Sequence, residues 1–258
     1  MKKVISLALS LFLAFSAFSV TAAAEDVPVT EPGSPALYSM KGEDATPDFI
    51  EKIEENGVDV SDESLIELVP IETTSRSLNV GNALVITNED ADTITKDVLV
   101  LVNDDITGFE TDTTISPRAS ISADFPPQSW DGRYVVHGTA VFTRIASGLI
   151  APYAQPISAN FSYKIEDNSC TVSRIELLYI CDGFEYSYPE LENLHLPEIE
   201  YVITVARSNP AQNTTYSTSR PYTTERAIMF ASGSPFVGQY LTFNTTTNTG
   251  PNNYTVKL

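Results

Sequence analysis

The chain has 258 residues, of which 34 are acidic and 15 are basic, so its formal net charge is −19. Such a charge argues against binding to nucleic acid or to anionic membranes, since both require basic patches. The acidic residues gather near the N-terminus, where Glu25 to Glu72 holds 14 acidic residues against 2 basic ones. We interpret this concentration as a solvated arm.

The N-terminus has the three parts of a secretory signal peptide. Two lysines are followed by the apolar run Val4 to Val20 and by three alanines that end at Ala24. We predict cleavage between Ala24 and Glu25, which makes residues 1–24 the signal peptide of a bacterial, secreted protein. No later apolar run approaches the ~18 residues needed to span a bilayer.

A flexible acidic leader and one short helix are expected next. Residues 25–45 are rich in proline and glycine and poor in apolar residues, which is typical of flexible chain. Thr46 as N-cap and Pro47 at the first helical position then predict a helix. Its apolar residues lie on one stripe, and Gly57 ends it.

Between this helix and the main domain, the apolar segment Leu65 to Ile71 predicts a strand. Pro70 limits that strand to a sheet edge, because proline donates no backbone hydrogen bond. Residues 46–72 are therefore expected to pack on the domain that follows as a short helix and an edge strand.

Residues 73–258 are expected to form an all-β, β-sandwich-like domain of antiparallel strands, because short strand patterns alternate there with turn signals. Ala83–Thr87 and Val98–Val102 are continuous apolar runs, and such strands are usually covered on both faces. A sandwich covers only one face, so we expect the helix at Pro47–Asn56 to cover the other.

Three consecutive strands are predicted within Ser158–Tyr188. Asp182-Gly183 indicates a two-residue hairpin turn, and the polar loop Glu166–Ser169 indicates the preceding hairpin. The apolar pattern changes phase after Val172, and one extra residue at Ser173-Arg174, a β-bulge, restores a single apolar face.

The chain has two cysteines, Cys170 and Cys181. Export favours a disulfide, but the two residues fall at opposite ends of one predicted strand, about 36 Å apart at ~3.3 Å per residue. A disulfide needs Cα atoms within about 7 Å. We therefore predict no disulfide and two buried free thiols.

Nucleophilic and metal chemistry would have to use one of two histidines, His137 and His195. His137 shares a strand face with Thr139 and is expected to be an isolated, half-exposed residue. No Gly-x-Ser-x-Gly pattern accompanies either histidine. A zinc site on His195 with Glu190 or Glu192 would have too few ligands.

Cofactor signatures are likewise incomplete. The loop Asn88–Asp92 resembles the start of a calcium loop, but Thr93 and Leu99 stand at its glycine and final glutamate positions. No glycine-rich phosphate loop occurs. We assign no catalytic, metal-binding or cofactor-binding residue and no cofactor.

Glycoside hydrolysis needs only two carboxylates at a fixed separation. Asp131, Glu176 and Glu185 are the acids nearest to predicted strands, but a chain with 34 acids offers many pairs, so none of the three is assigned.

An exported β scaffold without a nucleophile, metal site or phosphate loop favours an extracellular protein that binds a surface component, a glycan or another protein, without catalysis. Two alternatives stay open. One is a secreted glycan-acting hydrolase with two carboxylates, and the other is a structural component of an envelope assembly.

Overall fold

The computed structural model describes residues 36–73, 81–91, 93–103, 108–109, 130, 132–145, 153–187, 198–219, 226–229 and 238–258. All of them belong to the unit Glu31–Leu258. The predicted signal peptide, its cleavage site between Ala24 and Glu25, and residues 25–35 of the predicted leader lie outside the described residues.

Most of the described residues lie in antiparallel strands, which confirms the predicted all-β, sandwich-like class. The elements, in chain order, are β1 (Tyr38–Lys41), η1 (Gly42–Asp44), α2 (Pro47–Glu54), β2 (Leu65–Glu72), β3 (Asn82–Glu89), β4 (Thr93–Val102), β5 (Tyr134–Ile145), β6 (Tyr153–Ile165), β7 (Val172–Ser187), β8 (Glu198–Ser208), β9 (Tyr216–Ser219), β10 (Arg226–Met229), β11 (Gly238–Thr247) and β12 (Gly250–Lys257).

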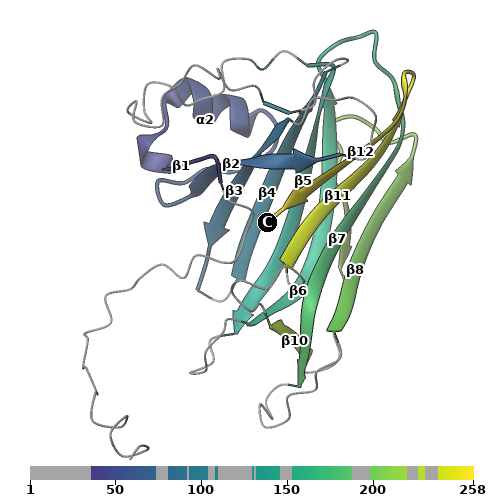
Figure 1. Cartoon of the computed structure of the whole chain (residues 1–258). Helices are drawn as coiled ribbons and strands as arrows, with labels where there is room; N and C mark the ends of the chain where they lie inside the picture. Colours follow the sequence, from purple (N-terminus) through teal and green to yellow (C-terminus); the bar gives the residue numbers. More distant parts are fainter. Residues whose placement is uncertain are drawn as a thin grey trace, which may run out of the picture. The chain divides into compact units, whose positions relative to one another are not determined.

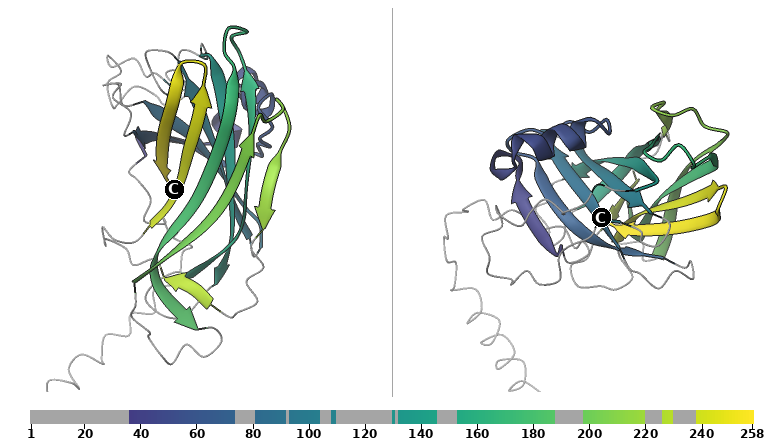
Figure 2. Two further views of the ribbon diagram at one scale, coloured as in Figure 1. Left: turned by 90° about the vertical axis from the view of Figure 1, so that its right-hand side faces the viewer. Right: turned by 90° about the horizontal axis from the view of Figure 1, so that it is seen from above.

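The strands form one sheet rather than two separate layers. The sheet has 12 strands in the order β1-β2-β12-β11-β7-β10-β6-β5-β4-β3, while β8 branches from β7 and β9 from β6. Because β2 also pairs with β3, the path of pairing closes on itself. The sheet curls round accordingly, as Figures 1 and 2 show, so its opposite walls face each other across a common core.

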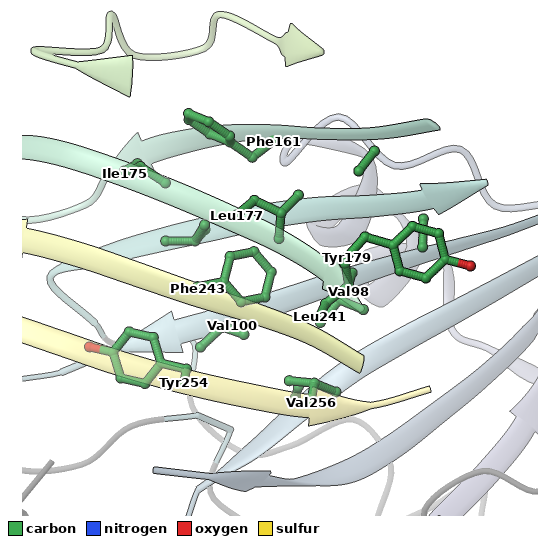
Figure 3. Packing of buried hydrophobic residues seen from close by; sticks show 14 of the residues in the cluster. Val98, Val100, Phe161, Ile175, Leu177, Tyr179, Leu241, Phe243, Tyr254 and Val256 are labelled. Atoms are coloured by element: carbon green, nitrogen blue, oxygen red, sulfur yellow. The ribbon is translucent and has the colours of Figure 1, made fainter. Parts of the chain in front are cut away.

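The inward side chains of the sheet form one continuous apolar core. Alternate residues of a strand point to the same face, so β5 contributes Tyr134, Val136, Ala140 and Phe142. Figure 3 shows side chains of β4, β6, β7, β11 and β12 meeting in the same core. Burial of apolar area, at about 25 cal/mol per Å², is the main favourable term for this fold.

A second apolar cluster lies on the outer side of the sheet, beneath α2. Phe49 and Ile53 of α2 are 2% and 0% exposed. They belong to one cluster with Leu84 of β3 and Leu99 of β4, against which Trp130 packs. β3 and β4 are therefore covered on both faces, which confirms the prediction from their continuous apolar runs.

The helix begins where the sequence predicts, but the segment before it is not all flexible leader. α2 follows Thr46 as N-cap, although the Thr46 side chain makes no capping hydrogen bond, and Gly57 beyond its end has a φ of 83°. β1 and η1 lie within residues 25–45, and β1 pairs with β2 from Tyr38 to Lys41. The prediction of flexible chain is thus wrong for residues 38–44, because backbone pairing orders a segment with few apolar residues.

Pro70 does not confine β2 to an edge, contrary to the prediction. β2 pairs with β3 along one side, where Pro70 lies opposite Asn82. Along its other side, β1 pairs no further than Leu68, and β12 begins to pair at Ile71. Pro70 therefore stands at the gap between two partner strands, where no backbone donor is required.

β6 and β7 do not pair as the predicted hairpin. Glu166–Ser169 does connect them, but β6 pairs with β5, β9 and β10, whereas β7 pairs with β8, β10 and β11. The predicted turn at Asp182-Gly183 is wrong as well. Asp182 pairs with Gly238 on one side and Glu200 on the other, and partners on both edges hold the backbone extended against its local turn preference.

The predicted β-bulge is confirmed at Ser173. On the neighbouring strand β11, Thr246 pairs with Arg174 and Thr247 pairs with Val172, so Ser173 is the extra residue. The bulge shifts the phase of β7, which is why Val172 and Ile175 both reach the core.

Cys170 and Cys181 are both buried, and no disulfide joins them. Cys181 lies inside β7, opposite Gln239 of β11 and Tyr201 of β8, whereas Cys170 precedes the strand. The extended segment Val172 to Cys181 spans about 30 Å at ~3.3 Å per residue. The continuous strand thus keeps the sulfur atoms apart.

Candidate functional site

His137 lies on the outward face of β5 and is only 7% exposed. The prediction of an isolated, half-exposed histidine is therefore wrong, because the chain beyond the end of α2 covers this part of the sheet. A Cβ atom at Gly57 would stand 3.9 Å from His137 Nδ1. Polar side chains from β4, β5 and β6 surround the ring: Asp97, Thr139 and Ser162. We call these four residues the Asp97–His137 network.

Strand register brings the members of this network together. Asp97 lies opposite Thr139 across β4 and β5, and His137 lies opposite Ser162 across β5 and β6. His137 and Thr139 share a face because they are two residues apart on one strand. The periodicity of β5 reveals that shared face, but only the pairing of the strands identifies Asp97 and Ser162 as neighbours.

Hydrogen bonds fix the orientation of the imidazole. Asp97 Oδ1 lies 2.8 Å from His137 Nε2 and accepts a 2.6 Å hydrogen bond from Thr139 Oγ1. A carboxylate only accepts, so Nε2 carries the proton and donates it to Asp97. When the only ring proton is on Nε2, Nδ1 can accept, and Ser162 Oγ stands 3.5 Å from it, at the outer limit of a hydrogen bond.

Ionic contacts hold the chain at the end of α2 against the neighbouring part of β6. Lys164 Nζ, two residues beyond Ser162, lies 3.0 Å from Glu166 Oε1 and 3.8 Å from Glu55 Oε2. Asn56 Oδ1 beside them is buried and accepts no hydrogen bond from the described residues. The network thus lies where the sheet meets the chain at the end of the helix.

A polar surface lies on the outward side of β7, β8, β11 and β12, and Figures 1 and 2 place no described helix over these strands. We call it the Thr/Asn face. Its side chains are half-buried or exposed. The register of the four strands sets its main members: Glu176, Leu178, Ile180, Val202, Thr204, Tyr240, Thr242, Asn244, Asn253, Thr255 and Lys257.

Two rows of side chains cross the strands of the Thr/Asn face, and hydrogen bonds join the members of each row. Asn253 Nδ2 donates to Asn244 Oδ1 at 2.5 Å, and Asn244 Nδ2 donates to Glu176 Oε2 at 3.2 Å. In the next row, the hydroxyl oxygens of Thr242 and Thr255 are 2.9 Å apart. These bonds fix the directions of the amide, carboxylate and hydroxyl groups before any ligand arrives.

Tyr240 supplies an aromatic ring at one end of this face. It lies between Ile180 of β7 and Lys257 of β12 in the register, and Lys257 Nζ is 6.0 Å from the ring centroid. Partial burial raises the pKa of the Tyr240 hydroxyl above its ordinary value, and the nearby carboxylates of Asp182 and Glu72 raise it further. The hydroxyl therefore stays protonated and can both donate and accept.

The acids considered for glycoside hydrolysis do not assemble into a site among the described residues. Glu176 lies on the Thr/Asn face, where it contacts Asn244 and, at 3.2 Å, Arg174 Nη2. The side chain of Glu185 and the whole of Asp131 lie outside the described residues, as do His195, Glu190 and Glu192. The described residues therefore do not test the two-carboxylate hypothesis or the zinc hypothesis.

Comparison of the chain with protein-family models, with curated proteins and with solved structures finds no match. Among the residues that the structure describes, no group of three or more histidine, cysteine or acidic side chains could hold a metal ion. Within the same part of the chain, no helix combines the length and apolar character needed to cross a membrane. The fold and the sites thus define a closed antiparallel sheet with a buried polar network and one polar outer face.

Proposed function

We propose that this protein is exported and binds an extracellular surface component, a glycan or another protein, through the Thr/Asn face. The predicted signal peptide supports export. The observation that carries the binding proposal is the hydrogen-bonded lattice of Glu176, Asn244 and Asn253 on a sheet whose inner side is packed.

A rigid polar lattice suits recognition because its groups need little reordering when a ligand binds. The inward neighbours of the lattice on β7 and β11, Leu177 and Phe243, are 0% exposed, so the backbone beneath the face is held in place. Directed amide, carboxylate and hydroxyl groups beside an aromatic ring are the combination that fixes the orientation of a polar ligand. A glycan meets both kinds of group with its hydroxyls and its apolar ring faces.

The test is a glycan-array screen of the purified protein, followed by affinity measurement on any hit. The double variant Tyr240→Ala with Asn244→Ala should weaken binding by about tenfold or more, because a few aromatic and polar side chains usually carry most of the binding energy of an interface. Thr95→Ala is the matched control: Thr95 is half-buried on the outward side of β4, away from this face. It should leave the affinity unchanged.

If the ligand is a protein, no glycan on the array should bind. The wild-type protein should then still retain extracellular surface material, and the double variant should not. Equal binding by the double variant and the wild type would contradict the proposal. Turnover of an array hit would instead favour the hydrolase alternative, which needs two carboxylates at a fixed separation.

A further inference from the structure

The Asp97–His137 network contains the three groups of a serine nucleophile site. Such a site needs a hydroxyl, a base that takes its proton, and an acid that orients the base. Here Asp97 Oδ1 holds His137 Nε2 at 2.8 Å, and Ser162 Oγ stands at the other ring nitrogen, 3.5 Å from Nδ1. The network lies on β4, β5 and β6, so it is separate from the Thr/Asn face.

We propose that Ser162 is an activated nucleophile that accepts an acyl group from a small ester, with His137 as its general base and Asp97 as the residue that positions His137. Asp97 and Thr139 hold the proton on Nε2, which leaves the lone pair of Nδ1 directed at Ser162. Hydrogen bonds between catalytic groups are often long before substrate binds and shorten in the complex.

Burial differs among the three residues as this chemistry requires. His137 and Asp97 are each 7% exposed, whereas Ser162 is half-buried. A reagent can therefore reach the hydroxyl while the base and its acid stay shielded from water, where their interaction is stronger. The chain at Gly57 passes close to Nδ1, since a Cβ there would be 3.9 Å from it, so a small acyl group is the expected substrate.

The arrangement reverses the roles that the ring nitrogens have in the familiar triad, in which the acid binds Nδ1 and the serine binds Nε2. The reversal follows from register: His137 lies directly opposite Ser162, whereas Asp97 lies diagonally across from it, opposite Thr139. Either nitrogen can act as base once the other carries the proton, so the reversal preserves the chemistry.

The reaction balances in two steps. Ser162 Oγ forms a bond to the ester carbonyl carbon, its proton passes to His137 Nδ1, and collapse of the tetrahedral intermediate breaks the ester C–O bond. The leaving alkoxide takes the proton from Nδ1, so an alcohol departs and Ser162 carries the acyl group. Water then attacks that acyl group with His137 again as base, which releases a carboxylic acid and restores the Ser162 hydroxyl.

The experiment uses a fluorophosphonate probe and p-nitrophenyl acetate on the purified protein. We expect one phosphonyl adduct, mapped to Ser162 by peptide mass spectrometry, and a burst of p-nitrophenol of one equivalent. Ser162→Ala should lose both. His137→Gln should keep Ser162 but slow its labelling by about a hundredfold to ten-thousandfold, the usual contribution of a general base.

Two controls separate reactivity from folding. Ser217→Ala removes an exposed serine of β9 and should label like the wild type. Asp97→Asn should slow the labelling of Ser162, and Ser162→Ala should not be labelled at that position. Circular dichroism checks that both variants retain the strand content of the wild type. The proposal would be overturned if folded wild-type protein formed no adduct at Ser162. It would also be overturned if His137→Gln left the labelling of Ser162 unchanged. Both outcomes are independent of what is found for the Thr/Asn face.

Discussion

Gly138 of β5 faces Phe243 of β11 across the core, so closely that a Cβ atom at Gly138 would stand 2.6 Å from the Phe243 ring. The two residues belong to strands separated by about a hundred positions in the chain, and their contact joins opposite walls of the closed sheet. Because glycine has no side chain, Gly138 leaves room on this face for a neighbouring side chain to pack closely. Phe243 takes that place, whereas Trp130 packs with Phe109 at a ring-centroid distance of 4.8 Å on the outer side.

Gly138→Ala is therefore expected to destabilise the protein by about 1–3 kcal/mol through overpacking. Urea unfolding followed by circular dichroism measures the change. The double variant Gly138→Ala with Phe243→Leu should lose less than the sum of the two single variants, because the smaller side chain makes room. Additive losses would show that the two residues do not compete for the same space.

Removal of the apolar contact beneath α2 should also destabilise the folded protein. Phe49→Ala empties a site that is 2% exposed and should lower the free energy of unfolding by about 3–5 kcal/mol. Ile50→Ala is the control, since Ile50 is only half-buried on the same helix, and it should cost clearly less. Equal losses in urea unfolding would mean that α2 does not cover the sheet with the Phe49 side.

Asp167 should contribute a pH-dependent part of the stability. The Ser169 hydroxyl and amide donate to the Asp167 carboxylate at 2.7 and 2.8 Å and hold its pKa below the ordinary value. A carboxyl whose pKa is lower in the folded state stabilises that state above the unfolded pKa, and the effect is lost as pH falls through the folded pKa. Ser169→Ala should thus be less stable than wild type near neutral pH, and the difference should shrink in acid.

The measurement for Asp167 is urea unfolding of both proteins at about pH 6.5 and about pH 2.5, on either side of the ordinary aspartate range. Ser173→Ala is a matched control on a neighbouring exposed serine, whose hydroxyl donates to the Thr246 carbonyl and to no carboxylate. A difference between wild type and Ser169→Ala that is equal at both pH values would contradict the assignment.

Both cysteines should titrate as thiols in the unfolded, unreduced protein. The continuous strand Val172 to Cys181 separates Cys181 from Cys170 by far more than the ~7 Å that a disulfide allows. Burial protects both groups from oxidation, because a buried cysteine packs as a small apolar residue. Ellman titration in denaturant should count two thiols, and a monomer mass two hydrogens below the reduced value would contradict the strand assignment.

Local sequence patterns determined the elements whose physics is local. Pro47 and Gly57 place the helix, the alternation of β5 identifies its buried face, and the phase change after Val172 locates the bulge at Ser173. Each feature depends on residues a few positions apart, so periodicity and backbone preference suffice to predict it.

Tertiary structure decided which strands are neighbours, and with them both candidate sites. Asp182-Gly183 favours a turn by itself, but pairing to β8 and β11 on both sides outweighs that preference. In the same way, Asp97 and Ser162 meet His137 only because β4 and β6 flank β5 in register. Pairing energy comes from residues far apart in the chain, and the sequence pattern of a single strand does not specify its partner.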